Sequence, residues 1–278
     1  MSLFPIQTAL NRSKTCWQLT CGICLFSGLG LCQGADLETN SYLSTSNINL
    51  QSLEPAGSSM NISSTPVADR GSHFGQTQPF AVFTNLDVGS PQLVGSVRPV
   101  EAGWNIIAGG ADIWGKSDQF HFVFKEISGD FDIAVRVESF MPAHLYSKAG
   151  IMIRETLDAS SPHMMFFVFY NNETRNHNLG AYEVQYRSVA GGDCQSIYPA
   201  VKPPAPPEFP AAYPNSWLRV ERRGDRFMTY GSTNGMTWKL YAEHVLTLAS
   251  TVKVGLALTS HNPKLPAKVM FRDYTEFK

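Results

Sequence analysis

The chain has few charged residues and no excess of either sign. Only 16% of its 278 residues are Asp, Glu, Lys or Arg, whereas roughly 25% is usual for soluble domains. The 22 basic and 23 acidic residues leave a net charge of -1. A nucleic-acid-binding protein normally shows a basic excess, so this balance argues against a nucleic-acid partner. The apolar fraction of 43% excludes a chain that is disordered throughout.

Cysteine is nearly absent outside the first part of the chain. Four of the five cysteines lie between Cys16 and Cys32, and only Cys194 lies elsewhere. Cys21-Gly-Ile-Cys24 resembles a redox or zinc motif, but no second pair and no histidine at zinc spacing accompany it. We therefore expect Cys194 to be a loop thiol, with an intermolecular disulfide as the alternative.

No apolar run reaches the ~20 residues that a membrane-spanning helix needs. The longest, residues 17–31, is interrupted by polar side chains and follows the basic residues Arg12 and Lys14. Small residues at Cys32 and Gly34 complete the pattern of a secretory signal peptide, residues 1–34, cleaved after Gly34. The mature chain is then expected without a transmembrane domain, and secreted, on the cell surface or in the periplasm.

Two alternatives exist for this N-terminal segment. An uncleaved anchor would still direct the rest of the chain outward, because the basic residues precede the apolar run. Lipid attachment at Cys32 is the second alternative, and the bulky Leu31 before it disfavours that chemistry.

Residues 35–79 are poor in aromatic residues and rich in Ser, Thr and Asn. Such a composition buries too little apolar surface to offset the entropy of ordering, and it predicts a flexible tether. Residues 80–278 contain no long helical periodicity. Short alternating runs recur instead between turn signals such as Ser128-Gly129-Asp130. We expect strands at 118–125, 131–137, 149–154, 164–170, 179–187, 217–224, 226–232, 236–241, 252–259 and 269–277.

Ten or more short strands predict an all-β domain, a two-sheet antiparallel β-sandwich or jelly roll, over residues 80–278. A proline-rich stretch at about 191–214 is expected to be a loop insertion, because proline is excluded from central strands. The oligomeric state is left open by the sequence.

Several motifs carry a family resemblance that covers residues 83–278 in order. They lie at residues 87–91, 109–115, 118–123, 148–155, 217–222, 232–238 and 254–261. With them the chain resembles a secreted, largely bacterial family of concanavalin A-like β-sandwich domains of unknown function, which includes the fungal "regulation of enolase protein". The resemblance implies the concanavalin A-like fold. It implies little about activity, although relatives often accompany carbohydrate-active enzymes or cell-surface repeats.

Strand alternation suggests one candidate ligand-binding face. If Phe120, Phe122 and Phe124 face the core, the intervening residues and the polar residues of later strands share the opposite face. Arginines and amides there would supply donors for sugar hydroxyls, and Trp114 a stacking ring. The candidate residues are Trp114, Gln119, His121, Arg136, Lys148, Arg154, Glu155 and His261. The alternative is that the charged members form cross-strand ion pairs on a solvated face.

No catalytic motif accompanies this face. A nucleophile elbow and a His-Glu-x-x-His motif are both absent, and arginines beside Glu138 and Glu155 would lower the carboxyl pKa values, the wrong direction for a general acid. We expect no enzyme and no cofactor. The retained alternative cofactor is calcium, with Asp112, Asp118 and Asp130 as candidate ligands near strand ends.

The expected function is therefore an exported, non-catalytic module that binds a glycan or polysaccharide through one sheet face. A structural or protein-interaction (adhesion) module at the cell surface is the first alternative. An unrecognised glycoside hydrolase is the second.

Overall fold

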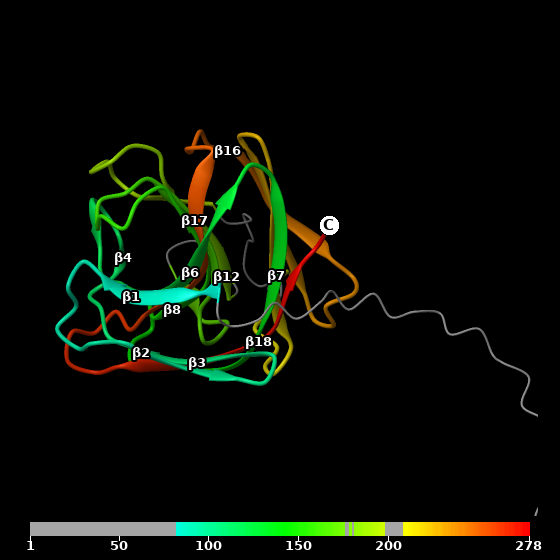
Figure 1. Cartoon of the computed structure of the whole chain (residues 1–278). Coiled ribbons are helices and arrows are strands. Elements are labelled where there is room, and N and C mark those ends of the chain that lie inside the picture. The colour runs from blue at the N-terminus through cyan, green and yellow to red at the C-terminus, as the bar shows by residue number, and fades with distance from the viewer. Residues whose placement is uncertain (1–81, 176–177, 180, 198–207) are drawn as a thin grey trace, which may run out of the picture. The chain divides into compact units, whose positions relative to one another are not determined.

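Strands account for nearly all regular structure in the computed structural model, which describes residues 82–175, 178–179, 181–197 and 208–278 (Figure 1). These residues belong to one compact unit. The predicted signal peptide, 1–34, and the predicted tether, 35–79, lie outside the described residues. No helix in the described ranges is long and apolar enough to cross a membrane.

Two seven-stranded antiparallel sheets make up the fold. Sheet A has the order β1-β6-β17-β8-β9-β12-β13, with bounds Thr84–Val88 (β1), Phe120–Ser128 (β6), Thr251–Thr259 (β17), Lys148–Arg154 (β8), His163–Val168 (β9), Tyr182–Arg187 (β12) and Gln195–Ile197 (β13). Sheet B has the order β16-β15-β14-β7-β18-β3-β2, with bounds Lys239–Val245 (β16), Arg226–Ser232 (β15), Ser216–Arg223 (β14), Phe131–Met141 (β7), Ala267–Glu276 (β18), Gly103–Ala108 (β3) and Ser96–Val100 (β2).

Two short hairpins complete the strand set. They are β4 (Ile113–Trp114) with β5 (Ser117–Asp118), and β10 (Thr174–Arg175) with β11 (Asn178–Leu179). Successive strands often lie in different sheets: β6 is in sheet A, β7 in sheet B and β8 again in sheet A. The C-terminal strand β18 lies between β3 and β7 in sheet B, whereas the first strand, β1, is an edge strand of sheet A (Figure 1). This crossing connectivity confirms the two-sheet antiparallel sandwich.

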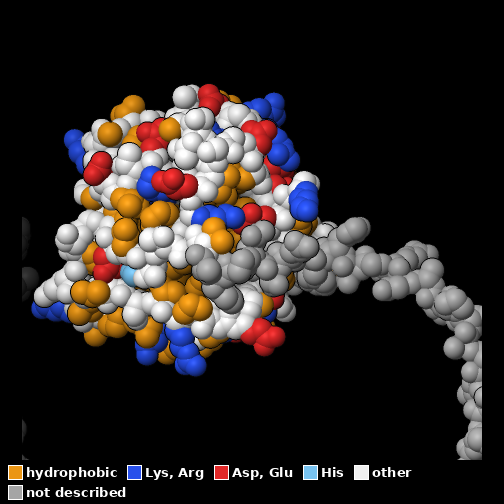
Figure 2. All heavy atoms as spheres, viewed as in Figure 1, with side chains coloured by type: hydrophobic (Ala, Val, Ile, Leu, Met, Phe, Trp, Pro, Cys, Tyr) orange, Lys and Arg blue, Asp and Glu red, His pale blue; other side chains and the backbone are white. Residues whose placement is uncertain are grey.

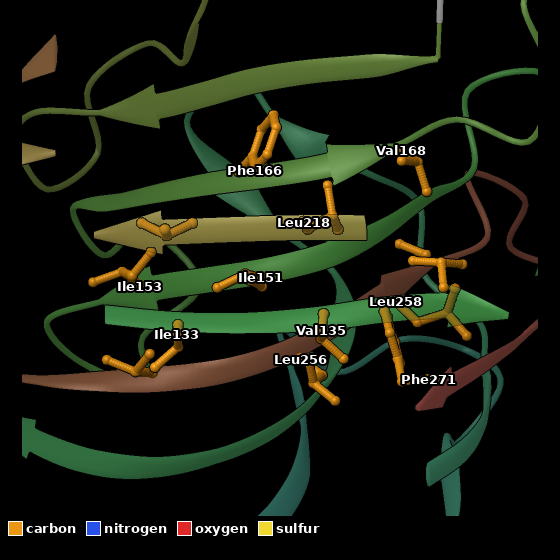
Figure 3. Close-up of a cluster of buried hydrophobic side chains, with 14 of the residues drawn as sticks. Ile133, Val135, Ile151, Ile153, Phe166, Val168, Leu218, Leu256, Leu258 and Phe271 are labelled. Carbon is orange, nitrogen blue, oxygen red and sulfur yellow. The ribbon is translucent and has the colours of Figure 1, made fainter. Parts of the chain in front are cut away.

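The main core lies between the sheets. Alternate residues of facing strands interdigitate there, as expected for a β-sandwich. Figure 3 shows ten of these side chains, which come from β7, β8, β9, β14, β17 and β18: Ile133, Val135, Ile151, Ile153, Phe166, Val168, Leu218, Leu256, Leu258 and Phe271.

Sheet A is apolar on its other face as well. The face that points away from sheet B is called the outer face here. Its second buried cluster includes the three β6 phenylalanines together with side chains of β1, β4, β8, β9 and β17: Val88, Ile113, Phe120, Phe122, Phe124, Met152, Met165, Phe167, Phe169 and Ala257. A sheet with both faces buried has strands that are continuously apolar. The prediction that residues 164–170 form such a strand is confirmed, since β9 is buried at every position.

The face assigned to the phenylalanines from the sequence was wrong. Phe120, Phe122 and Phe124 lie on the outer face of sheet A, whereas Val123 belongs to the core between the sheets. Both faces of β6 are buried, so alternation identifies two faces but does not say which one meets the second sheet. Because the two faces of β6 are exchanged, the candidate residue His121 lies on the face that meets sheet B and not on the outer face.

The stretch predicted as a loop insertion, 191–214, contains a strand. Residues 195–197 form β13, which pairs with Val184, Gln185 and Tyr186 of β12 and ends sheet A. Five prolines of this stretch, at 199, 203, 204, 206 and 207, lie outside the described residues.

The described surface carries interspersed charges of both signs with apolar side chains between them, and no large patch of one sign gathers on the face in Figure 2. This distribution agrees with the near-zero net charge of the sequence.

Candidate functional site

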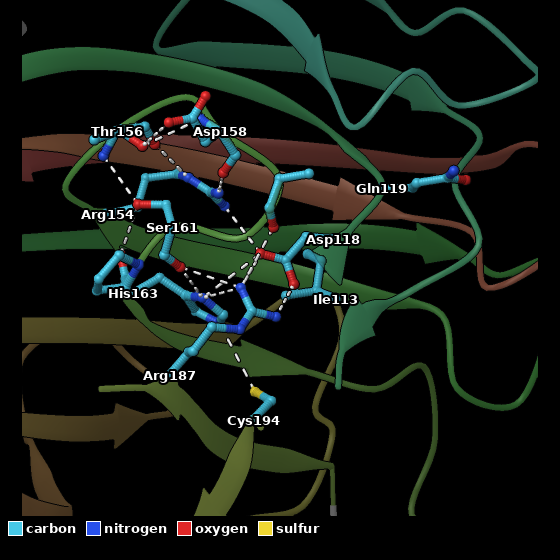
Figure 4. A network of polar contacts seen from close by, with 12 residues as sticks. Ile113, Asp118, Gln119, Arg154, Thr156, Asp158, Ser161, His163, Arg187 and Cys194 are labelled. Carbon is cyan, nitrogen blue, oxygen red and sulfur yellow. Dashed lines mark hydrogen bonds and ion pairs between the residues drawn. The ribbon is translucent and has the colours of Figure 1, made fainter. Parts of the chain in front are cut away.

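A buried charge cluster lies on the outer face of sheet A, at the end where β8 and β12 finish. Asp118 at the end of β5 accepts two hydrogen bonds from Arg187, at 2.7 and 2.8 Å, and one from Arg154 at 3.2 Å. His163 of β9 lies beside them, with its Nδ1 3.6 Å from Asp118 Oδ2. All four side chains are fully buried. Figure 4 shows this buried arginine cluster, Asp118, Arg154, His163 and Arg187, with Gln119 pointing away from it.

Backbone carbonyls satisfy the remaining guanidinium donors of the cluster. Arg154 donates to the carbonyls of Thr156 and Asp158, and Arg187 donates to those of Gly115 and Gly192. Buried charges are tolerated when they are paired and fully hydrogen-bonded. The cluster therefore ties the loops around 156–158, 115 and 192 to the sheet.

Burial also sets the protonation of the neighbouring side chains. Burial lowers the pKa of His163 to about 4, with the two arginines adding to the effect and Asp118 opposing it. His163 is thus neutral near pH 7. Burial raises the pKa of the Cys194 thiol to about 12, so this side chain is an unreactive thiol rather than a nucleophile.

The cluster positions the β4–β5 hairpin over sheet A. Arg187 Nη2 donates to Gly115 O at 3.0 Å, and the Cys194 amide donates to the same carbonyl at 2.9 Å. Gly115 is the turn residue of this hairpin, with a φ of 58°. Ile113 packs into the outer-face cluster from the same hairpin. Trp114, between these two anchors, is left with 41% of its surface exposed.

Next to this hairpin lies an open cavity of about 250 Å³, which we call the outer pocket. Its walls combine aromatic rings with polar side chains from β4, β8 and β12 and the loops before β4, before β8, after β9 and after β17: Asp112, Trp114, Tyr146, Lys148, Phe169, Glu183, Gln185 and His261. Ligand pockets typically join apolar walls with a few fixed polar groups.

Lys148 and Asp112 form the charged centre of the outer pocket. Lys148 Nζ donates to Asp112 Oδ1 at 2.6 Å and to the Ile113 carbonyl at 2.8 Å, and its side chain is 3% exposed. The ammonium lies 5.7 Å from the centre of the Trp114 ring and 5.8 Å from that of Phe167. These contacts hold a buried cation by both charge and aromatic faces.

The pKa of Asp112 lies below its ordinary value. Burial alone raises the pKa of this carboxyl, but the hydrogen bond with His261 and the charge of Lys148 outweigh it. Asp112 is therefore ionised near pH 7. A carboxylate held in this state is unsuited to act as a general acid.

Histidine and tyrosine rings form the rim of the pocket. His261 Nδ1 lies 3.2 Å from Asp112 Oδ2, and the His261 ring lies 4.5 Å from His144 and 5.5 Å from Tyr146 between centres. His261 has a φ of 52°, in the left-handed region that few non-glycine residues occupy. Backbone strain of this kind persists only where the surroundings fix it, and it often marks a binding site.

Three of the eight predicted site residues meet in the outer pocket: Trp114, Lys148 and His261. Lys148 and Arg154 do share one face of β8, as the alternation predicted. Arg154 nevertheless lies in the buried arginine cluster, with its guanidinium over the Phe120 ring at 5.1 Å. It is fully buried and presents no surface to solvent.

The other four predicted residues lie apart from the outer pocket. His121 belongs to the opposite face of β6, buried with Nδ1 2.7 Å from Asp87 Oδ1. Gln119 accepts a hydrogen bond from the Ala111 amide. Glu155 accepts one from the Ala249 amide at 2.7 Å. The single shared face predicted from the sequence is therefore not present, because His121 lies on the inner face of β6 and Arg136 belongs to sheet B.

Arg136 lies in sheet B, away from all of these. Its Nε donates to Asp273 at 2.6 Å, and its guanidinium lies 5.9 Å from the Trp217 ring centre. Glu138 pairs with it at 3.5 Å and with Arg272 at 3.2 Å. This is the cross-strand ion-pair arrangement that the sequence analysis named as the alternative.

Glu183 and Gln185 of the pocket were missed. They alternate along β12 with Tyr182 and Val184, which belong to the core between the sheets. A row of polar residues at one parity of a predicted strand was the signal that could have found them. Tyr146 and Phe169 carry no such signal, because only the fold brings their loops together.

The three aspartates proposed as calcium ligands lie in separate surroundings. Asp112 pairs with Lys148, Asp118 with two arginines, and Asp130 accepts the Gly224 amide at 2.7 Å. Among the described residues, no three His, Cys, Asp or Glu side chains are grouped as metal ligands.

The architecture places the protein in the class of concanavalin A-like β-sandwiches. A protein of unknown function from Saccharomyces cerevisiae has the same fold, with a TM-score of 0.54, 18% identity, and alignment over 72% of this chain and 98% of that one.

Two further structures are more distantly similar. The carbohydrate-binding module CBM66 from Bacillus subtilis has a TM-score of 0.43, with 16% identity over 71% of this chain and 96% of that one. The exoplasmic/lumenal domain of VIP36, in its Ca2+- and mannose-bound form, has a TM-score of 0.44, with 10% identity over 70% and 82% of the two chains. No protein-family model matches the chain, and no curated sequence matches it significantly.

Proposed function

We propose that this protein is an exported, non-catalytic module that binds a glycan in the outer pocket. The observation that carries the proposal is the combination of an exposed tryptophan, a tyrosine and a phenylalanine around a polar floor. Sugars present apolar ring faces edged by hydroxyl groups, and such a pocket matches both parts: the rings can stack on the sugar face while fixed polar atoms bind its hydroxyls.

The size of the pocket supports a single sugar residue as the unit bound. Its volume of about 250 Å³ is below the roughly 300–1,000 Å³ of pockets that enclose drug-sized ligands. A terminal sugar, or one residue of a longer chain whose neighbours extend past Trp114, suits this space.

The non-catalytic part of the proposal rests on the state of Asp112, one of the two carboxyl side chains that line the pocket, the other being Glu183. Asp112 is ionised and paired on both oxygens, with Lys148 and His261. A glycosidase requires a carboxyl group with a raised pKa to protonate the leaving oxygen. A glycoside hydrolase activity, the alternative enzyme function, would therefore need a different acid.

Replacing the exposed ring tests the binding site. Trp114→Ala should weaken glycan binding by about two- to tenfold, because stacking on an aromatic ring contributes about 0.5–1.5 kcal/mol. The measurement is titration calorimetry with a glycan selected on an array using the wild-type protein. Trp238→Ala, which removes an equally large ring from the loop just before β16, is the matched control and should leave the affinity unchanged.

Other outcomes separate the alternatives. Equal weakening by both tryptophan variants would exclude the outer pocket as the site. A protein that binds no glycan on the array would favour the adhesion or protein-interaction function instead. Loss of affinity in EDTA would support the calcium hypothesis, whereas the proposal includes no metal.

Export is tested by N-terminal sequencing of the mature protein, which should begin after Gly34.

A further inference from the structure

One polar atom on the floor of the outer pocket is buried without a partner. Gln185 is 4% exposed, and its side-chain oxygen Oε1 has no hydrogen-bond partner among the residues that the structure describes. A buried carbonyl oxygen that lacks a donor is rare in folded proteins, and one that lines a cavity points to a ligand or water that supplies the donor.

The contact with Glu183 shows which end of the amide is left without a partner. Gln185 Nε2 donates to Glu183 Oε1 at 2.7 Å. The NH2 group is therefore engaged, and the unpartnered atom is the amide oxygen, which can only accept a hydrogen bond. The oxygen is then the group that Gln185 offers to a ligand, and the ligand must provide an O–H or N–H donor.

The cation of the pocket is already engaged. Two of the three Lys148 donors are used by Asp112 and the Ile113 carbonyl. An acidic sugar would have to compete with Asp112 for this ammonium and would lie near two carboxyl side chains, those of Asp112 and Glu183. Like charges at short range disfavour binding, and the effect is strong in a partly buried site.

Resting on the glycan-binding function proposed above, we propose that the outer pocket selects an uncharged sugar, with one hydroxyl or acetamido N–H donating to Gln185 Oε1. Gln185 is then a specificity-determining residue for the group at C6, because a hydroxyl there can donate a hydrogen bond to Oε1, whereas the carboxylate of a uronic acid cannot. Trp114 and Tyr146 contact the ring of the same sugar.

Matched pairs of sugars test the selectivity. The probes are the methyl glycosides of glucose, galactose and mannose and of the corresponding uronic acids, which differ only in oxidation at C6. Binding is measured by NMR titration of the wild-type protein at pH 7 and constant ionic strength. The expected result is that the best neutral sugar binds at least about tenfold more tightly than its uronic acid, as for one lost hydrogen bond plus repulsion. Equal or tighter binding of the acid would overturn the inference.

A substitution then tests the residue. Gln185→Met keeps the side-chain length and removes the hydrogen-bond acceptor. It should lower the affinity for the neutral sugar by about tenfold. Gln195→Met, the same change on the neighbouring strand β13, is the matched control and should have no effect. A folded Gln185→Met protein, verified by circular dichroism, with unchanged affinity would contradict the role of this residue. If the variant does not fold, the wild-type sugar pairs still decide the selectivity.

The two proposals fail differently in this experiment. Binding of sugars without the preference for the neutral member would remove the inference and leave glycan binding intact. Absence of binding to all six glycosides and to the array would overturn the proposed function, and the inference with it.

Discussion

At the scale of single residues, two groups of polar side chains on the outer face of sheet A have different surroundings. Asp118 neutralises part of the charge of Arg154 and Arg187, which hold loops through their carbonyl contacts. Lys148 and Gln185 instead line an open cavity. The same face thus contains a closed, structural cluster and an open, ligand-accessible group.

His163 makes the stability of the domain depend on pH. Its folded-state pKa of about 4 lies below the ordinary value of 6.5, so the unfolded chain binds more protons than the folded one between these values. Stability should therefore fall as the pH falls from 6.5 towards 4, by on the order of 3 kcal/mol from this residue.

Urea unfolding of wild-type protein and of His163→Gln, at several pH values, measures this effect. The free energy of unfolding is plotted against pH for each protein. The difference between the two slopes is the contribution of His163, because the carboxyl groups titrate in both proteins. Parallel curves for the two proteins between pH 6.5 and 4 would contradict this prediction, because they would mean that His163 binds its proton equally in the folded and unfolded states.

At the scale of elements, the β4–β5 hairpin connects the buried arginine cluster with the outer pocket. The hairpin begins beside Asp112, contains Trp114 and ends at Asp118. Its turn carbonyl, at Gly115, accepts hydrogen bonds from Arg187. One short element therefore contributes to the buried arginine cluster and to the wall of the outer pocket.

Removing the negative charge of the buried arginine cluster should lower the free energy of unfolding. Asp118→Asn leaves two buried arginines without their counter-charge, and breaking a buried ion pair in this way costs about 3–5 kcal/mol. Urea denaturation measures the change in the free energy of unfolding. Asp130→Asn, at an exposed aspartate that accepts one backbone hydrogen bond, is the control and should change it by less than about 1 kcal/mol. Similar effects of both variants would contradict the role of the cluster.

Strand alternation predicted the central elements of the fold well. The ten predicted strands all overlap strands of the structure, and the turns at Gly129, Gly224 and Gly235 have the positive φ that glycine allows. The N-terminal strands β1, β2 and β3 were not individually predicted. They are short, and β2 contains a proline, so their patterns are weak.

The candidate site was predicted only in part, because the sequence does not show which strands are neighbours in the sheet. Trp114, Lys148 and His261 were named from composition and parity, but Gln185 was not. Which strands lie beside β8 depends on contacts between residues far apart in the chain, and one sequence does not contain that information. The inverted β6 faces have the same origin, since both faces of that strand are apolar.

At the scale of the whole molecule, sheet A is buried on both faces but incompletely covered on one. Sheet B covers the inner face, whereas a hairpin and loops cover the outer face and leave the pocket near Trp114 open. A concanavalin A-like sandwich supports many functions. The proposed function therefore rests on the open part of this face rather than on the fold.

A crystal structure with a bound sugar is the decisive measurement for glycan binding in the outer pocket. Crystals of the protein would be soaked with the neutral sugar that binds best in the titrations. We expect the sugar to lie in the outer pocket with its ring against Trp114 and a hydroxyl within hydrogen-bond distance of Gln185 Oε1. A sugar bound elsewhere, such as beside Arg136 and Trp217 on sheet B, with the outer pocket empty, would contradict this expectation.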